Sequence, residues 1–255
     1  MAANTFVWYE LVTRDVDAAL AFYGRLLGWE ARDFPGGADR YAVVHAKGKP
    51  VGGVMALPEG MTEPFWLGYV GTADIDAALA RFRAAGGTLH RGPWEIPDVG
   101  RLALVSDPQG VGLALFEGAS DQPSEAFNQR APGHGNWHEL RTTDPDAAFD
   151  FYAGQFGWTR GDALGMGAMG TYQLFKAGEA AIGGIMKAPA GTRPAWQYVF
   201  GSPSIDAALA LIRDGGGTVL HGPSEVPGGA LVVQARDPQG AAFALVGPAG
   251  RREAA

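Results

Sequence analysis

The feature that most constrains the fold of this chain is an internal duplication. Residues 15–30 read DVDAALAFYGRLLGWE, and residues 144–159 read DPDAAFDFYAGQFGWT. In the same way PVGGVM at 50–55 returns as AIGGIM at 181–186, and DPQG occurs at both 107–110 and 237–240. These offsets are 129, 131 and 130 residues. Because a repeat with a nearly constant offset is the signature of a repeated structural unit, we expect two related halves.

A weaker repeat lies inside each half. The segment DIDAALARF at 74–82 resembles DVDAALAFY at 15–23, and each such segment begins with Asp or Ser before apolar residues at helical spacing. Strand-like segments surround each of these helices, in the order strand, helix, three strands. The sequence therefore predicts an α+β fold of four βαβββ modules paired into two domains, 1–117 and 135–248, with a polar linker at 118–134 and a tail at 249–255.

Composition excludes several functions. The net charge is −7 without a dense Lys/Arg run, which disfavours nucleic acid as a partner. No apolar run is long enough to span a bilayer, and the N-terminus lacks the pattern of a signal peptide, so we expect a cytoplasmic protein. The absence of cysteine removes disulfides, thiolate nucleophiles and iron–sulfur clusters. A monomer or a homodimer is expected, since the duplication already supplies a second domain.

These motifs resemble those of the vicinal oxygen chelate superfamily, which includes glyoxalases, bleomycin resistance proteins and extradiol dioxygenases. The residues that carry the resemblance are the D-x-D-A-A-x-x-F-Y helices, the GW, GGT and DPQG segments, and the tandem W-x-E-L strands at 8–11 and 137–140. The W-x-E-L branch carries glyoxalase or hydroxylase labels. The resemblance implies that the modules curl their sheets around clefts, in which metal-dependent members bind a metal ion.

The resemblance also implies where metal ligands would stand. On the first strand of each half these positions are Trp8 and Trp137, and on later strands they are Gly68, Tyr198, Ala114 and Ala244. None of these residues is a usual metal ligand. We therefore expect no cofactor and no metal site.

A histidine and a glutamate stand side by side in NWHEL, residues 136–140. Because side chains alternate between the two faces of a strand, Trp137, Glu139 and Arg141 share one face and His138 points away. A β-bulge could reverse this register. The alternative is therefore a divalent metal ion held by relocated ligands such as His138 and Glu139.

Glu10 and Glu139 stand at matching positions of the two repeats, each on an otherwise apolar strand. A carboxylate in an apolar cavity suits either general acid–base chemistry or ligand binding, and it can equally stabilise a loop. Aromatic side chains suit a pocket that stacks on planar ligands, although tryptophans also pack in cores. The predicted ligand-binding residues are Trp8, Trp66, Trp137, Arg141, Trp196 and Tyr198.

The halves also differ. Arg141 stands where the first half has Val12, and Arg101 stands where the second half has Leu231. The Gly- and Met-rich segment 160–172 suits a lid over a cleft. These differences indicate that the cleft of the second half has the more specialised role.

Two functions remain open from the sequence. The first is metal-free binding of a small, planar organic molecule in aromatic clefts, for sequestration, transport or resistance. The alternative is an enzyme of this superfamily, an isomerase, lyase or hydroxylase-like protein, in which Glu10 or Glu139 acts as acid–base. Whether the protein is an enzyme stays undecided at this point.

Overall fold

The computed structural model describes residues 4–34 and 40–250, so the end of the predicted tail, residues 251–255, lies outside it. The first half contains β1 (Phe6–Thr13), α1 (Val16–Leu27), β2 (Trp29–Asp33), β3 (Tyr41–Ala46), β4 (Lys49–Ala56), β5 (Phe65–Gly71), α2 (Ile75–Ala84), β6 (Thr88–Ile96), β7 (Gly100–Ser106) and β8 (Gly112–Gly118). The second half contains β9 (Gly135–Thr142), α3 (Pro145–Phe156), β10 (Thr159–Gly165), the 3-10 turn η1 (Gly167–Met169), β11 (Thr171–Ala177), β12 (Ala180–Lys187), β13 (Ala195–Gly201), α4 (Ile205–Asp214), β14 (Thr218–Glu225), β15 (Leu231–Arg236) and β16 (Ala242–Gly247).

Strand order repeats between the halves. It is β2-β3-β4-β1-β5-β8-β7-β6 in the first eight-stranded sheet and β10-β11-β12-β9-β13-β16-β15-β14 in the second. Within each module the first strand pairs in parallel with the last, as β1 does with β4, and the hairpins between them are antiparallel. The predicted α+β fold of four βαβββ modules is confirmed.

Each helix begins where the sequence predicts it. The side chains of Asp15, Asp74, Asp144 and Ser204 accept a hydrogen bond from the main-chain N–H three residues later, which caps the four helices. Gly28 and Gly157 end α1 and α3 in the left-handed conformation, which glycine adopts without a steric penalty. None of the described helices is long and apolar enough to cross a membrane.

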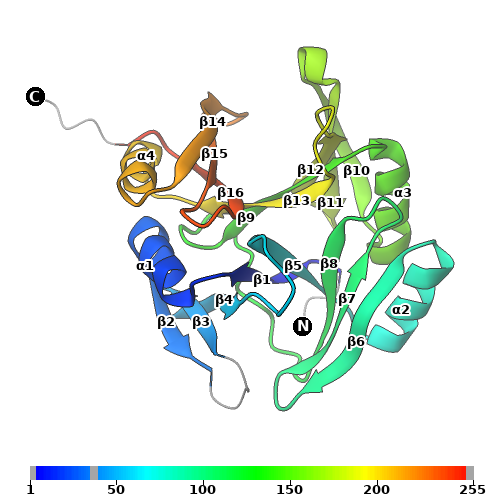
Figure 1. Cartoon of the computed structure of the whole chain (residues 1–255). Helices are drawn as coiled ribbons and strands as arrows, with labels where there is room; N and C mark the ends of the chain where they lie inside the picture. Colours follow the sequence, from blue (N-terminus) through cyan, green and yellow to red (C-terminus); the bar gives the residue numbers. More distant parts are fainter. Residues whose placement is uncertain (1–3, 35–39, 251–255) are drawn as a thin grey trace, which may run out of the picture. The chain divides into compact units, whose positions relative to one another are not determined.

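The modules pack as two compact units that do not coincide with the sequence halves. One unit combines the described residues up to Val7 with Leu67–Ser124 and Trp137–Gln197. The other combines the described residues within Trp8–Trp66, Glu125–Asn136 and those from Tyr198 onward. In the first unit α2 packs near α3, and in the second α1 packs near α4 (Figure 1). Each unit has its own aromatic core.

The DPQG motif fastens modules within a unit. Asp237 accepts hydrogen bonds from the main-chain N–H groups of its own turn and one from the Tyr23 hydroxyl at 3.2 Å. The Gln239 side chain donates to the main-chain carbonyl of Asp15 and accepts from its N–H, both at 2.7 Å. The other copy is equivalent and uses Asp107 with Tyr152 and Gln109 with Asp144. The repeated motif is therefore a structural latch.

Candidate functional site

The first candidate site lies on one face of the module that comprises β1, β3 and β4. Trp8 and Glu10 are two residues apart on β1, so their side chains lie on the same face. Glu10 stands beside Gly53 of the neighbouring strand β4, and Tyr41 is the first residue of β3. We call the residues that share this side of the three strands the first strand face: Trp8, Glu10, Val12, Tyr41, Val43, His45, Gly53 and Met55. Trp8 and Tyr41 are half-buried, and Glu10 is 7% exposed.

Three side chains of this face form a directed chain of hydrogen bonds. The indole Nε1–H of Trp8 donates to the hydroxyl of Tyr41 at 2.9 Å. Because a tryptophan can only donate, the tyrosine proton is left for its second partner, the Glu10 carboxylate. Burial raises the pKa of Tyr41 well above its usual range, and the charge of Glu10 adds to the effect. Tyr41 therefore stays a neutral donor, and the chain fixes the orientation of all three groups.

The glycine pair of β4 explains why the tyrosine can lie in this position. A Cβ at Gly53 would overlap the ring of Tyr41, and a Cβ at Gly52, on the other face, would overlap the main chain of Tyr9. In the second half, a Cβ at Gly184 would overlap the Tyr172 ring in the same way. The repeated GG pair thus leaves room for a ring that crosses the strand.

The second half repeats this arrangement on β9, β11 and β12. The Nε1–H of Trp137 donates to the Tyr172 hydroxyl at 2.8 Å, and Tyr172 in turn donates to Glu139. Burial raises the pKa of Tyr172, and the Glu139 charge raises it further. The second strand face comprises Trp137, Glu139, Arg141, Tyr172, Leu174, Lys176, Gly184 and Met186.

The two faces differ at the residue that follows the glutamate on the same side of the strand. Arg141 donates through Nε to Oε1 of Glu139 at 2.7 Å, and its Nη2 lies 2.7 Å from the same oxygen. In the first half the matching residue is Val12, which stands beside Met55. Only the second face therefore carries an ion pair of this kind.

His138 lies on the opposite side of β9 from Glu139. Its imidazole is fully buried, its Nδ1 donates to the Ile182 carbonyl at 2.7 Å, and its ring stacks on Phe6. Burial lowers the pKa of His138 to about 3. The His138 ring and the Glu139 carboxylate do not converge, so the structure does not bring this candidate pair together.

Three of the predicted ligand-binding aromatics lie in the cores. Trp66 donates to the Tyr23 hydroxyl at 3.1 Å, and Trp196 donates to the Tyr152 hydroxyl at 3.3 Å. Tyr198 packs edge-on against Tyr9 with the ring centroids 5.6 Å apart. All three are buried, and the contacts that the structure shows for them are with other core aromatics.

The segment proposed as a lid joins β10 to β11 through η1. Met166 and Met169 near its tip are exposed, at 38% and 56%. A part in covering a ligand stays a prediction.

A metal site needs several donor side chains that converge on one point. Across residues 4–34 and 40–250, no group of three or more His, Asp or Glu side chains converges as a metal site would require. Each strand face offers one carboxylate, and in the second face Arg141 already occupies it. The described residues do not fit the ligand set of a metal-dependent relative.

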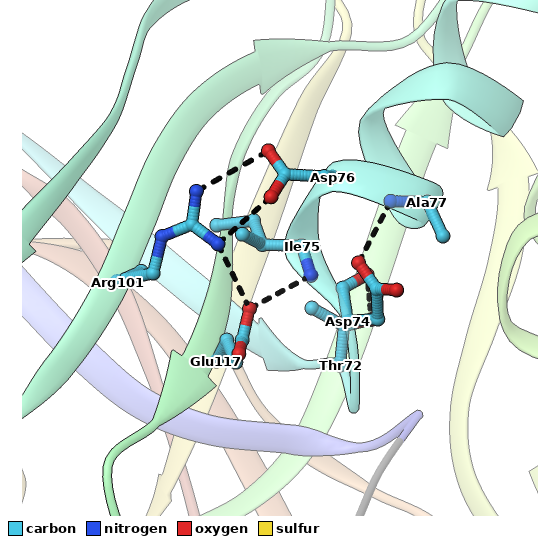
Figure 2. A network of polar contacts seen from close by, with 7 residues as sticks. All are labelled: Thr72, Asp74, Ile75, Asp76, Ala77, Arg101 and Glu117. Carbon is cyan, nitrogen blue, oxygen red and sulfur yellow. Dashed lines mark hydrogen bonds and ion pairs between the residues drawn. The ribbon is translucent and has the colours of Figure 1, made fainter.

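Arg101, the other difference between the halves, belongs to a capping network (Figure 2). Its guanidinium binds both carboxylate oxygens of Asp76, at 2.9 and 3.2 Å, and lies 3.6 Å from Glu117. Glu117 also accepts the N–H of Ile75 at the start of α2. An anion at a helix N-terminus is favourable, so Arg101 supports a helix rather than a ligand site.

Two surface hollows lie away from the strand faces, in the unit that contains α1 and α4. The larger, about 470 Å³, is lined mainly by Gly, Pro and Ala around Asn136 and Gly201, and the smaller, about 350 Å³, lies between α1 and α4. Neither is lined by a carboxylate, a histidine or an aromatic residue. They offer little chemistry for specific recognition.

Comparison with known proteins gives consistent matches over most of the chain. The profile of the Glyoxalase/Bleomycin resistance protein/Dioxygenase superfamily matches twice, at residues 5–115 and 134–245. "Putative glyoxylase CFP32" of Mycobacterium tuberculosis is 32% identical over 248 residues, which covers 95% of this chain and 94% of the relative. The anthracycline biosynthesis protein DnrV of Streptomyces peucetius is 28% identical over 256 residues, with coverage of 94% and 91%.

Solved structures with the same fold include metal enzymes. The Mn(II)-bound glyoxalase from Novosphingobium aromaticivorans has a TM-score of 0.68 at 17% identity, covering 97% of this chain and 83% of its own. The 2,3-dioxygenase LapB from Pseudomonas sp. KL28 has a TM-score of 0.68 at 12% identity, with coverage of 95% and 91%. At these identities the likeness concerns the fold alone.

Proposed function

Because the chain belongs to the Glyoxalase/Bleomycin resistance protein/Dioxygenase superfamily, we propose that it binds a small, planar organic molecule on its strand faces without a metal ion. The ligand stacks on Trp8 or Trp137 and directs a hydrogen-bond donor to the adjacent glutamate. Solved structures with the same fold include an enzyme named for a small aromatic substrate, 2,2',3-trihydroxybiphenyl 1,2-dioxygenase, so a small ligand agrees with the fold.

The observation that carries the proposal is the chain of hydrogen bonds from tryptophan through tyrosine to glutamate, present in both halves. It holds the flat indole and the carboxylate in fixed relative positions. A rigid aromatic surface beside a fixed acceptor loses little entropy when it takes up a flat ligand that carries an N–H or O–H group. Trp8 and Trp137 are half-buried, so part of each ring remains accessible.

The proposal involves no metal ion because the strand faces carry few side chains that could bind one. Trp8 and Trp137 occupy the strand positions at which the family resemblance places metal ligands, and His138 faces the core. A divalent ion would need at least two further side-chain donors on each face. Beyond its glutamate, the first face offers His45 as a further donor, and the second face offers the cations Arg141 and Lys176.

The name of one relative supports a planar ligand. DnrV is described as an anthracycline biosynthesis protein, and anthracyclines are flat, fused-ring molecules with hydroxyl groups. A ligand of that general shape would stack on one indole and donate to one carboxylate.

Acid–base catalysis is the second candidate, and the burial of Glu10 favours it. A carboxylate that is 7% exposed and hydrogen-bonded to a neutral tyrosine is held in one orientation, as a proton-transfer group must be. In that case Glu10→Gln abolishes turnover of a bound ligand but leaves binding within a few fold of the unmodified protein.

The test is a calorimetric titration of chelator-treated protein with 1,8-dihydroxyanthraquinone, a neutral planar probe. The double variant Trp8→Ala/Trp137→Ala should lose about tenfold or more in affinity, since a stacked aromatic contact and its buried area are removed. Trp94→Ala, which removes a half-buried tryptophan outside both faces, is the control and should leave the affinity unchanged. Equal affinity in the double variant, with circular dichroism showing it folded, would refute the proposal.

A further inference from the structure

The two strand faces are near copies that differ in charge. Tryptophan, glutamate, tyrosine, glycine and methionine stand at matching positions, whereas three pairs differ: Val12 and Arg141, Val43 and Leu174, and His45 and Lys176. Two of the three changes add a cation to the second face. Because the aromatic and carboxylate groups are the same, these cations are the main distinction between the faces.

Lys176 follows Tyr172 by four residues on β11, and β11 has no inserted residue between them. Because strand side chains repeat every two residues, the two lie on the same face. The side chain is half-buried, and its Cε lies 3.4 Å from the position of a Cβ at Gly161 on β10. The absence of a side chain at Gly161 thus gives the lysine stem room along the sheet. A lysine packed by its stem keeps its ammonium group available at the edge of the face.

Arg141 has donors in excess of those that Glu139 uses. Its contacts with the carboxylate use Nε and Nη2, and its Nη1 makes no hydrogen bond to another residue in the described part of the chain. The Arg141 side chain is 29% exposed and that of Glu139 is 16% exposed. The arginine therefore offsets the Glu139 charge and still presents a donor edge, which suits a carboxylate, sulfonate or phosphate.

We propose that the second strand face selects planar molecules that carry an anionic group, and the first strand face selects neutral or cationic planar molecules that donate a hydrogen bond. This inference rests on the proposed function and assigns the ligand class of each face. On the second face the anion is placed against Arg141 while the ring stacks on Trp137, and Lys176 adds positive charge at the other end of the face. On the first face the charge of Glu10 repels an anion and favours a protonated amine, and Val12 supplies no cation to offset it.

The test uses two flat probes of similar size and opposite charge, anthraquinone-2-sulfonate and proflavine. The variant Trp137→Ala isolates the first face, and Trp8→Ala isolates the second. At pH 8, where ordinary histidines are neutral, the first face should prefer proflavine and the second should prefer the sulfonate, each by about tenfold, since one or two charges act in a partly solvated site. Both preferences should weaken in high salt.

Exchanging the residues at positions 141 and 12 then tests whether Arg141 causes the charge preference of the second face. Arg141→Val in the Trp8→Ala background should lower the sulfonate affinity about tenfold, and Val12→Arg in the Trp137→Ala background should raise it by a similar factor. Lys187→Val removes an exposed cation on the opposite side of β12 and is the control, with no expected change.

The outcomes are distinguishable. Probes that bind both faces with the same charge preference, or a preference that Arg141→Val leaves unchanged, would overturn this inference while leaving the proposed function intact. Failure of both charged probes and of 1,8-dihydroxyanthraquinone to bind would overturn the proposed function, and this inference with it.

Discussion

The ring of Phe6 lies 3.8 Å from the imidazole of His138, with only 16° between the two planes. This stack places the one histidine of the W-x-E-L strands in an aromatic core with Trp158 and Trp196, on the side of β9 away from Glu139. The histidine that most suggests a metal ligand in the sequence therefore serves as a packed ring with a fixed hydrogen bond.

The stack predicts a pH-dependent stability. Since the folded pKa of about 3 lies below the ordinary histidine value near 6.5, folding requires a neutral ring. The contribution is complete above pH ~6.5 and is lost as the pH falls towards 3, at about 1.4 kcal/mol per unit. His138→Phe keeps a ring for stacking and cannot be protonated, so its unfolding free energy relative to the unmodified protein should rise by about 2 kcal/mol from pH 6.5 to 5.

Urea unfolding at several pH values measures this difference. The exposed His221→Gln is the control and should show no such trend. A pH dependence in His138→Phe equal to that of the unmodified protein would contradict the buried, neutral histidine.

Alanine in place of the glycines that face Tyr41 and Tyr172 should lower stability, whereas alanine at a glycine with open space around it should raise stability. Gly53→Ala or Gly184→Ala places a methyl group against the Tyr41 or Tyr172 ring, so each should destabilise by about 1–3 kcal/mol through overpacking. Gly154→Ala lies in α3 with open space around its Cβ and should stabilise by about 0.5–1 kcal/mol. Thermal unfolding measures all three, and a neutral Gly53→Ala would mean that Tyr41 does not cross β4.

The DPQG latch predicts a loss of stability when the half-buried Gln239 side chain is truncated. Gln239→Ala removes two hydrogen bonds to the main chain of Asp15, and we expect about 1–2 kcal/mol of destabilisation. The exposed Gln122→Ala should have no measurable effect. Equal unfolding midpoints for the two variants would show that the latch does not stabilise the fold.

The capping network at α2 predicts a salt-dependent effect. Arg101→Leu, which installs the residue found at the matching position 231, should lower the thermal midpoint in dilute buffer. Since the ion pairs are exposed, the difference should largely vanish at about 1 M NaCl. Arg130→Leu, another exposed arginine, serves as the comparison, and an equal loss there would argue against a specific role for Arg101.

The fold could be predicted from the sequence because the same sequence motifs occur in each repeat. Each of the four helical segments has an Asp or Ser cap and an apolar stripe, and the DPQG and GG motifs recur 130 and 131 residues later, so each module supports the others. The composition of the compact units was not accessible, because it depends on contacts between modules distant in the chain, such as the latch between Gln239 and Asp15.

The candidate site was accessible only in part. Alternation predicts which residues share a face of β1 or β9, but it does not tell which face of β5 or β13 meets a helix. Trp66 and Trp196 pack against tyrosines of α1 and α3, a contact set by helix packing rather than by strand periodicity. Tyr41 and Tyr172 were missed because they come from other strands. Two signals were present, since both stand at matching positions near the start of equivalent strands and a GG pair faces each.

The most direct test of the account is a calorimetric titration with 1,8-dihydroxyanthraquinone before and after treatment with a chelator, with Mn²⁺ then added back. Metal-free recognition by the strand faces predicts the same affinity in all three samples and a loss of binding in the double variant Trp8→Ala/Trp137→Ala. Binding that disappears with the chelator and returns with Mn²⁺ would contradict it.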